Sequence, residues 1–358
     1  MRKTGTLDVR DEETQYQLVI VRALGYKHHI GLRRFIDEAL VARQIVKMGD
    51  QIVPPDLIIV SLPTLFGVFA AARMKKTLRC SLVADVRDLW PDVLLQKLPL
   101  QLRPFFRLPV RAMRWRTSRA LRFADAIIGT SEQFVNWATG IVGRDRTQFD
   151  RAFPLAYDLQ EPIDAQDRSL AEVLSRDIHQ ERVAVFAGTL VPQFDFDLIL
   201  KVATRMPEIG FVICGDGPLF EALNKKAPQN VYMTGWLGAN ALRQVLNRAD
   251  VALAPYVSTN DFQANIPNKI VEYLASGLPI VSSLTDGLVA NLLSSENVGS
   301  TAPRDDIVAW QSAITNWLSL SENELGRASE KCRVIFQERF DAQRVALEYV
   351  QLMEDLAR

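Results

Sequence analysis

The sequence has 358 residues, of which 48% are hydrophobic and 23% are charged, which is typical of a folded globular protein. Because a chain of this length exceeds one ordinary hydrophobic core, we expect two domains. The formal net charge is zero, but residues 1–158 hold 25 Lys and Arg against 16 Asp and Glu, and residues 159–358 hold 17 against 26. The first half is therefore expected to face an anionic partner.

The cysteines and histidines exclude several classes of protein. Cys80, Cys214 and Cys332 lie far apart, and the three histidines have no metal-binding spacing. This argues against a disulfide framework and a zinc site, and it favours a reducing cytosolic compartment. Residues 1–17 are polar and charged, unlike a signal peptide. The longest uncharged apolar run, residues 57–72, is short for a membrane span and contains Pro63.

Strands and helices are predicted to alternate along the first half of the chain. The predicted strands are residues 18–22, 56–61, 81–85 and 126–129, and the predicted helices are residues 31–48 and 64–76. Because these strands are apolar throughout, we expect a parallel sheet that is covered on both faces. Ser131 is the predicted N-cap of the helix that follows.

An irregular stretch, residues 153–179, is predicted to link the two domains. Alternation then restarts with strands 183–186, 210–214, 231–233, 251–254 and 279–282, and with helices 195–206, 218–226, 239–247 and 268–276. Ser321 and Glu324 form a predicted capping box. The last helix is expected to bury five apolar side chains at helical spacing, namely Val345, Tyr349, Leu352, Met353 and Leu356.

We therefore expect an α/β fold with two Rossmann-like, doubly wound parallel-sheet domains facing a cleft. The expected domains are residues 1–158 and 159–340, and the terminal helix, residues 341–358, is expected to pack back toward the first domain. Ligands usually bind between two such domains.

One helix N-terminus is the strongest candidate for a binding site. A strand ending at Ala254 leads through a polar loop to a short helix from Asn268, which Gly277 ends. In a parallel sheet this N-terminus lies at the carboxyl edge of the strands, where open α/β sheets bind ligands. Backbone N–H groups and Lys269 suit an anionic diphosphate. Glu272, one turn later, offers a carboxylate to sugar or ribose hydroxyls; a solvated helix face is the alternative for both residues.

Two short motifs favour structural roles. Asp195-Phe196-Asp197 resembles a metal-binding DxD motif, but it opens an apolar helix, so we expect N-capping. In Gly215-Asp216-Gly217 the third glycine of a dinucleotide fingerprint is replaced by Phe220, which argues against that cofactor. The glycines are expected to let backbone pass close to a ligand.

Four charged residues, Asp85, Arg87, Asp88 and Asp92, cluster after a predicted strand. Asp88 is equally consistent with a general base or sugar ligand and with an ion-paired loop residue. His28 and His29 are interpreted as surface loop residues, with contact to a substrate as the alternative. Ser131 lacks the Gly-x-Ser-x-Gly pattern of a nucleophile, which leaves helix capping as its role.

A basic, amphipathic segment runs from Lys97 to Arg122. It holds eight basic residues interleaved with apolar ones, and no acid occurs between Asp92 and Asp125. We expect this segment to contact an anionic membrane surface. The candidate contact residues are Arg103, Arg107, Arg111 and Arg114. A solvated helix face is the alternative, and nucleic acid is not expected because no binding module is recognisable.

Several motifs resemble GT-B glycosyltransferases. In the second half they are residues 211–218 (FVICGDGP), 230–236 (NVYMTGW), 249–255 (ADVALAP) and 268–279 (NKIVEYLASGLP), which resemble the donor-binding domain of the retaining family four. In the first half they are residues 55–61 (PDLIIVS), 85–91 (DVRDLWP) and 123–131 (FADAIIGTS), which resemble bacterial surface-polysaccharide members.

The resemblance implies a nucleotide sugar, UDP- or GDP-linked, in the second domain and a lipid-linked saccharide acceptor in the first, at the cytoplasmic face of the plasma membrane. It implies neither a cofactor nor a metal. Asp88 and Lys269 would serve catalysis, Glu272 would hold the ribose, and Trp236 and Leu237 would lie by the base. The implied donor-binding residues are Gly188, Thr189, Gly215, Gly217, Trp236, Leu237, Tyr256, Asn265, Ile266, Asn268, Lys269 and Glu272.

The sequence departs from the family pattern in three ways. Ala264 stands eight positions before Glu272, where the family commonly has a second glutamate. The Arg and Lys that usually follow the first strand of the second domain are absent from residues 188–195, so Lys269 is the expected replacement. The family's opening strand and glycine-rich loop are either missing, which we favour, or replaced by residues 18–22.

These departures keep alternatives open. One is a degenerate GT-B protein that binds nucleotide sugar or a partner without turnover. Another is an inverting enzyme similar to a GT-B glucuronosyltransferase of exopolysaccharide synthesis. A two-lobed sugar receptor is a weaker alternative.

Overall fold

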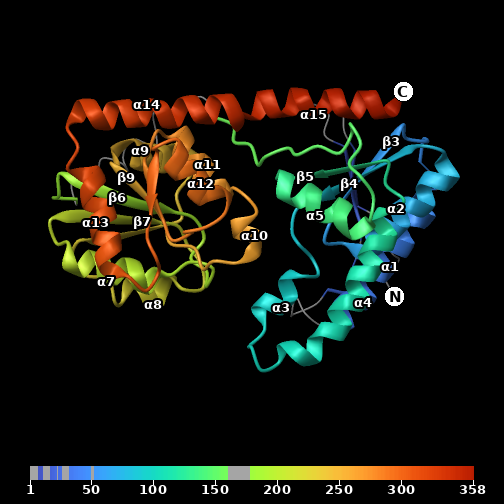
Figure 1. Ribbon diagram of the computed structural model, residues 1–358, viewed down its shortest axis with the longest axis horizontal. Coiled ribbons are helices and arrows are strands. Elements are labelled where there is room, and N and C mark those ends of the chain that lie inside the picture. The colour runs from blue at the N-terminus through green and yellow to red at the C-terminus, as the bar shows by residue number, and fades with distance from the viewer. Residues whose placement is uncertain (1–6, 11–16, 22, 26–31, 50–51, 160–177) are drawn as a thin grey trace. The chain divides into compact units, whose positions relative to one another are not determined.

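The computed structural model describes residues 7–10, 17–21, 23–25, 32–49, 52–159 and 178–358. The chain divides into two compact units (Figure 1). Unit 1 consists of Met1–Phe153 and Glu348–Arg358, and unit 2 consists of Pro154–Leu347. The division between the units falls at the start of the irregular stretch of the sequence.

Unit 1 contains a parallel sheet in the order β3-β4-β5, with β3 at Leu57–Ser61, β4 at Ser81–Val86 and β5 at Ala126–Gly129. The apolar residues of β4 and β5 are buried, as expected for a sheet covered on both faces. Helices α1 (Leu32–Gly49) and α2 (Leu65–Leu78) pack against each other, and α5 (Glu132–Val142) packs on β5. The hydroxyl of Ser131 accepts a hydrogen bond from the Phe134 amide, which confirms the predicted N-cap.

The strand predicted at residues 18–22 has a different partner from the one expected for a parallel sheet. Strand β2 (Gln17–Ile20) pairs antiparallel with β1 (Leu7–Arg10) in a separate two-stranded sheet. Apolar residues indicated a strand here, but the partner strand comes from an adjacent part of the chain. In the described part of the chain β3 is therefore an edge strand, and Ile59 is 43% exposed. Strand β2 therefore does not take the place of the family's opening strand in the parallel sheet.

The basic segment of unit 1 begins at the last residue of α3 (Val93–Lys97) and contains all of α4 (Arg103–Leu121). Val110, Thr117, Ala120 and Leu121 are buried, so one face of α4 packs on the unit. Long apolar side chains on the remaining surface of the segment are exposed. None of the described helices combines the length and apolar character that crossing a bilayer requires.

Unit 2 contains a six-stranded parallel sheet in the order β11-β10-β9-β6-β7-β8. The strands are β6 (Arg182–Ala187), β7 (Ile209–Cys214), β8 (Val231–Gly235), β9 (Val251–Ala254), β10 (Ile280–Ser282) and β11 (Gly299–Thr301). The chain starts at β6, adds β7 and β8 on one side, and then crosses to add β9, β10 and β11 on the other. The strand order thus reverses at β6, and open α/β sheets bind ligands at such a reversal.

Helices cover both faces of this sheet (Figure 1). Helices α7 (Phe196–Arg205), α8 (Phe220–Asn224) and α13 (Ile307–Leu318) lie on one face, and α9 (Ala239–Arg248), α11 (Asn268–Ala275) and α14 (Glu322–Arg339) lie on the other. The short α10 (Asn260–Gln263) and α12 (Leu288–Ser295) complete the connections. The helix predicted at 218–226 is shorter, because a turn occupies residues 217–219 before α8 begins.

Two predicted helix caps are confirmed. The Asp195 carboxylate accepts a hydrogen bond of 3.0 Å from the Leu198 amide, and it forms an ion pair with Arg304. Ser321 and Glu324 form a reciprocal capping box at the start of α14. In the described residues, no group of His, Cys, Asp and Glu side chains is arranged to hold a metal ion.

The last helix, α15 (Ala342–Ala357), is less buried than the sequence predicts. Only Leu352 among the five predicted core residues is buried, and the other four are half-buried. Its C-terminal part belongs to unit 1, where Tyr349 packs edge-on against Phe153 and the Leu356 carbonyl accepts a hydrogen bond from Ser81. The helical spacing gave the correct face, but a single helix on a surface is covered on one side only.

Candidate functional site

A pocket of about 450 Å³ lies at the carboxyl ends of β6, β7 and β8, next to the point where the strand order of unit 2 reverses. Six residues predicted from the sequence line it, namely Gly188, Thr189, Gly215, Gly217, Trp236 and Leu237. Three further residues line it, namely Cys214, Asp216 and Leu242. The fold thus brings three loops that are distant in sequence to one site.

Glycine is required where two of these loops meet. Gly215 has a φ of 138°, and a Cβ atom there would lie 2.0 Å from the Gly188 carbonyl oxygen. Gly188 has a φ of 141°, and a Cβ atom there would lie 1.4 Å from Nζ of Lys269. Both positions exclude side chains on steric and conformational grounds. The glycines therefore let the loops pack closely and leave room for the lysine.

Lys269 points toward the carboxyl end of β6 rather than into solvent. Its ammonium group donates a hydrogen bond to the Ala187 carbonyl and lies 4.8 and 5.1 Å from the ring centroids of Phe186 and Phe194. These distances allow cation–π attraction. Burial lowers the pKa of Lys269 to about 8, and the negative charge of Glu272 opposes part of that effect. A cation is therefore held beside Gly188, a pocket residue.

Glu272 lies one turn after Lys269 on α11, and its side chain is half-buried. Its Oε1 atom accepts a hydrogen bond of 3.4 Å from the Tyr157 hydroxyl. Burial raises the pKa of Glu272, whereas Lys269 and Tyr157 act in the opposite direction. Burial also raises the pKa of Cys214, a pocket residue, to about 12, and the charge of Glu272 contributes to that rise. The carboxylate therefore lies close enough to the pocket to influence it electrostatically.

Besides Lys269 and Glu272, four more predicted donor-binding residues do not line the pocket. Asn268 is exposed at the first position of α11. Asn265 and Ile266 are half-buried in the preceding loop, and Oδ1 of Asn265 is buried without a hydrogen-bond partner among the described residues. Tyr256 is a core residue, 2% exposed, whose ring packs on Phe194 and Phe262. For Tyr256 the structure differs from the prediction, because aromatic packing places the ring inside unit 2.

Asp88 belongs to unit 1 and follows β4. Its Oδ1 atom accepts a hydrogen bond of 3.1 Å from the Trp90 amide, which is a local turn contact. The neighbouring Asp85 is buried, accepts a hydrogen bond from the Ser61 hydroxyl and forms an ion pair with Arg87. Asp92, the fourth member of the predicted cluster, accepts a hydrogen bond from Trp137 and pairs with Arg114. Asp85, Arg87 and Asp92 therefore have structural partners, and Asp88, which is half-buried, remains the catalytic candidate.

The four arginines predicted to contact a membrane differ in their surroundings. Arg107 and Arg111 are exposed on α4, while Arg114 forms an ion pair of 3.4 Å with Asp92. Arg103 is half-buried and donates a hydrogen bond to the Leu98 carbonyl. Large apolar side chains are exposed around them, namely Leu100, Leu102, Phe105, Phe106, Leu108 and Trp115. The segment thus presents both cations and apolar groups.

Sequence reasoning missed Tyr157, which belongs to the predicted linker. Its backbone amide donates to the Phe340 carbonyl, its carbonyl accepts from the Ala342 amide, and its side chain reaches Glu272. No local pattern indicates such a contact, because the partners lie more than a hundred residues away. Asp216 could have been found, since it lies between two predicted pocket glycines.

Comparisons with known proteins identify what this chain resembles. Residues 181–319 match the family described as Glycosyl transferases group 1. The chain is 28% identical over 127 residues to the putative colanic acid biosynthesis glycosyltransferase WcaL of Escherichia coli, and 26% identical over 118 residues to the chitobiosyldiphosphodolichol beta-mannosyltransferase of Candida albicans. These matches cover 35% and 30% of this chain, and 31% and 25% of the two relatives.

Solved structures share the fold over most of both chains. The UDP complex of Anabaena HepE has a TM-score of 0.66 at 16% identity, covering 88% of this chain and 82% of that one. The lipopolysaccharide outer core galactosyltransferase WaaB has a TM-score of 0.58 at 14% identity, covering 92% and 82%. The chain therefore has the α/β fold of GT-B glycosyltransferases, and the segment that matches the group 1 family contains the pocket together with Lys269 and Glu272.

Proposed function

We propose that the protein is a glycosyltransferase that transfers a sugar from a nucleoside diphosphate to a lipid-linked saccharide in cell-surface polysaccharide synthesis. The single observation that carries this proposal is the pocket at the strand-order reversal of unit 2, with the ammonium group of Lys269 next to its residue Gly188 and the charge of Glu272 acting on its residue Cys214. The match of residues 181–319 to a glycosyltransferase family supports it. The HepE structures contain UDP and UDP-glucose, which supports a UDP-linked donor in particular, with a GDP-linked donor as the second choice.

The pocket residues and the neighbouring residues of α11 each contact a different part of the donor. The base lies at Trp236 and Leu237, the ribose hydroxyls reach Glu272, and the diphosphate meets Lys269 and the amide groups at the start of α11. When the bond from the anomeric carbon to the diphosphate breaks, negative charge grows on the leaving oxygen. Lys269 stabilises that charge because its ammonium group is already held in place. This arrangement uses the lysine where other transferases use a metal ion.

The acceptor hydroxyl forms the new bond to the anomeric carbon. In a retaining, front-face reaction its proton passes to the departing phosphate oxygen, so atoms and charge balance without a covalent intermediate on the enzyme. Asp88 is the proposed unit 1 residue near the reacting sugar. The motifs that resemble retaining family four support this stereochemistry.

The basic segment supports a lipid-linked acceptor at the inner face of the plasma membrane. Exposed arginines attract anionic headgroups, and the exposed apolar side chains of α4 can enter the interface between headgroups and acyl chains. The name of the Candida albicans relative describes an acceptor on a dolichol diphosphate, which supports this class of acceptor.

A second candidate function is nucleotide-sugar binding without turnover. Ala264 stands where the family commonly has an acid, and it is buried, 6% exposed. A buried alanine offers no group to the donor. If that acid is essential for transfer, the protein would keep the nucleotide pocket and lose catalysis.

An assay of nucleotide release separates the two functions. The purified protein is incubated with UDP-sugars or GDP-sugars and with lipid-linked saccharides from bacterial membranes, and free UDP or GDP is measured. We expect release that requires both substrates. Nucleotide binding without release, for all donors, would favour the second function, and a folded protein that binds neither nucleotide would contradict both.

A further inference from the structure

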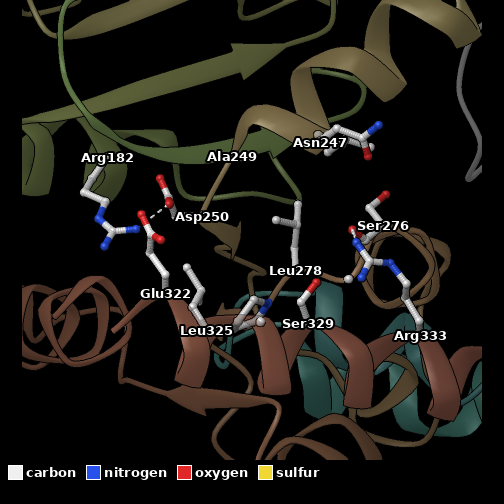
Figure 2. A pocket seen from close by; sticks show the side chains of 14 residues that line it. Arg182, Asn247, Ala249, Asp250, Ser276, Leu278, Glu322, Leu325, Ser329 and Arg333 are labelled. Atoms are coloured by element: carbon white, nitrogen blue, oxygen red, sulfur yellow. Dashed lines mark hydrogen bonds and ion pairs between the residues drawn. The ribbon is translucent and has the colours of Figure 1, made fainter. Parts of the chain in front are cut away.

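A second pocket of about 530 Å³ lies in unit 2 at the amino ends of the strands, where β6, β9 and β10 begin (Figure 2). The first pocket lies at the opposite, carboxyl ends. Arg182, Asp250 and Leu278 reach it from the strand starts, and Glu322, Leu325, Ser329 and Arg333 reach it from α14. Nothing in the proposed transfer reaction uses this edge. Its volume falls within the range of small-molecule sites, which is about 300–1,000 Å³.

Two glycines shape this pocket. Gly326 lies in the second turn of α14, where glycine weakens a helix, and a Cβ atom there would meet no heavy atom within 4 Å. Part of the space in the pocket therefore exists because residue 326 has no side chain. Gly277 has a φ of 74°, and a Cβ atom there would lie 2.5 Å from the Ser329 hydroxyl, so α14 can approach the end of α11 closely.

The charged side chains of this pocket are largely neutralised by protein partners. Arg182 forms an ion pair of 2.8 Å with Asp250, which also accepts a hydrogen bond from the Val183 amide. Arg333 donates to the Ser276 carbonyl and lies 3.9 Å from Glu330. The two arginines and the two lining carboxylates, Asp250 and Glu322, give a formal charge of zero. A ligand with net charge therefore gains little here.

Hydrogen-bonding capacity nevertheless remains. In the described part of the chain, the side chains of Asn247, Glu322 and Ser329 form no hydrogen bond with other residues. Together they offer amide donors and acceptors, a carboxylate and a hydroxyl. Leu278 and Leu325 add apolar surface between these polar groups. No aromatic side chain is among the described residues that line the pocket, so a nucleobase has no ring on which to stack.

We propose that this pocket binds a short, uncharged saccharide. Each sugar hydroxyl both donates and accepts a hydrogen bond, which matches the mixed donors and acceptors, and the C–H faces of a sugar ring match the leucines. The balanced charge disfavours phosphorylated sugars and nucleotides. This site is separate from the nucleotide pocket and does not depend on the proposed transfer reaction.

The test uses the full chain and two neutral disaccharides, maltose and lactose, observed by saturation-transfer NMR. We expect binding to the unchanged protein, and weaker binding of glucose 6-phosphate than of either disaccharide. Gly326→Leu fills the open space, and we expect it to abolish the signal while nucleotide binding stays unchanged. The double variant Asn247→Ala/Ser329→Ala should weaken saccharide binding by about fivefold or more.

Gly140→Leu is the matched control. Gly140 also lies within a helix, α5 of unit 1, and a Cβ atom there would likewise meet nothing within 4 Å. This variant should bind the disaccharides as the unchanged protein does. The absence of any disaccharide signal would overturn the proposal, and so would a signal that Gly326→Leu leaves intact or a stronger signal from glucose 6-phosphate. Nucleotide binding is measured separately, so these outcomes do not affect the proposed function.

Discussion

At the scale of single residues, the account depends on how Lys269 is held. The Ala187 carbonyl and the faces of Phe186 and Phe194 fix the ammonium group in a half-buried position, and this burial lowers its pKa to about 8. A cation already in place loses little conformational entropy when a diphosphate binds. The same burial makes the charge of Lys269 sensitive to mildly alkaline pH.

UDP affinity should therefore fall as the pH rises through about 8. Below that pH Lys269 is protonated and attracts the diphosphate, and above it the neutral amine does not. Lys269→Met should bind UDP roughly tenfold to a hundredfold more weakly, as expected from a charged hydrogen bond of about 1.5–3 kcal/mol, and should lose this alkaline limb. Calorimetric titration at a series of pH values measures both effects. If the UDP affinity of the unchanged protein stays constant as the pH rises through about 8, Lys269 does not have this role.

Tyr157 should tune the carboxylate of Glu272. Its hydroxyl is one of the groups that lower the pKa of Glu272 against the larger effect of burial. UDP binding should weaken at acidic pH, where the Glu272 carboxylate is protonated. Tyr157→Phe removes the hydroxyl, so the pKa of Glu272 should rise and this acidic loss of UDP affinity should move to higher pH. Tyr232→Phe is the control, because Tyr232 donates a comparable hydrogen bond to Gln180 in the same unit. Equal acidic limbs in the two variants would show that Tyr157 only packs.

At the scale of helices and strands, capping explains residues that resemble a metal motif. The Asp195 carboxylate accepts from the Leu198 amide and pairs with the partly exposed Arg304. Asp195→Ala should lower the free energy of unfolding by about 1 kcal/mol, mostly through the lost cap. Asp195→Asn should retain most of that stability, because asparagine is an equally good N-cap. Urea denaturation measures both variants. If the asparagine variant loses as much as the alanine variant, the cap is not the cause.

The elements that could be predicted from the sequence are those with strong local signals. Strands β5 and β9 were predicted with the observed bounds, because each is a short apolar run between turns. Gly215 and Gly217 could be located because their loop follows such a strand, and Lys269 because it lies in the first turn of the helix predicted after β9. Three features could not be predicted, because each depends on partners that only the folded chain brings together. They are the pairing of β2 with β1, the interior position of Tyr256 and the hydrogen bond from Tyr157 to Glu272.

At the scale of the whole molecule, the opposite charges of the two halves suggest that unit 1 contacts anionic lipid. The full chain should bind vesicles that contain phosphatidylglycerol and should bind neutral phosphatidylcholine vesicles much more weakly. Replacing Arg107 and Arg111 with Gln should weaken binding by about 1 kcal/mol for each cation, and added salt should weaken it further. Vesicle co-sedimentation measures this. Equal binding to both kinds of vesicle would contradict an electrostatic contact.

The central claim is that a nucleoside diphosphate binds in unit 2 with its ribose at Glu272. The most direct measurement is calorimetric titration of UDP and GDP into the unchanged protein and into Glu272→Gln. The account predicts one nucleotide per chain, and a loss of roughly tenfold or more in the variant, since a hydrogen bond to a charged group contributes about 1.5–3 kcal/mol. It is contradicted if the folded, unchanged protein binds neither nucleotide, or if Glu272→Gln binds as tightly as the unchanged protein.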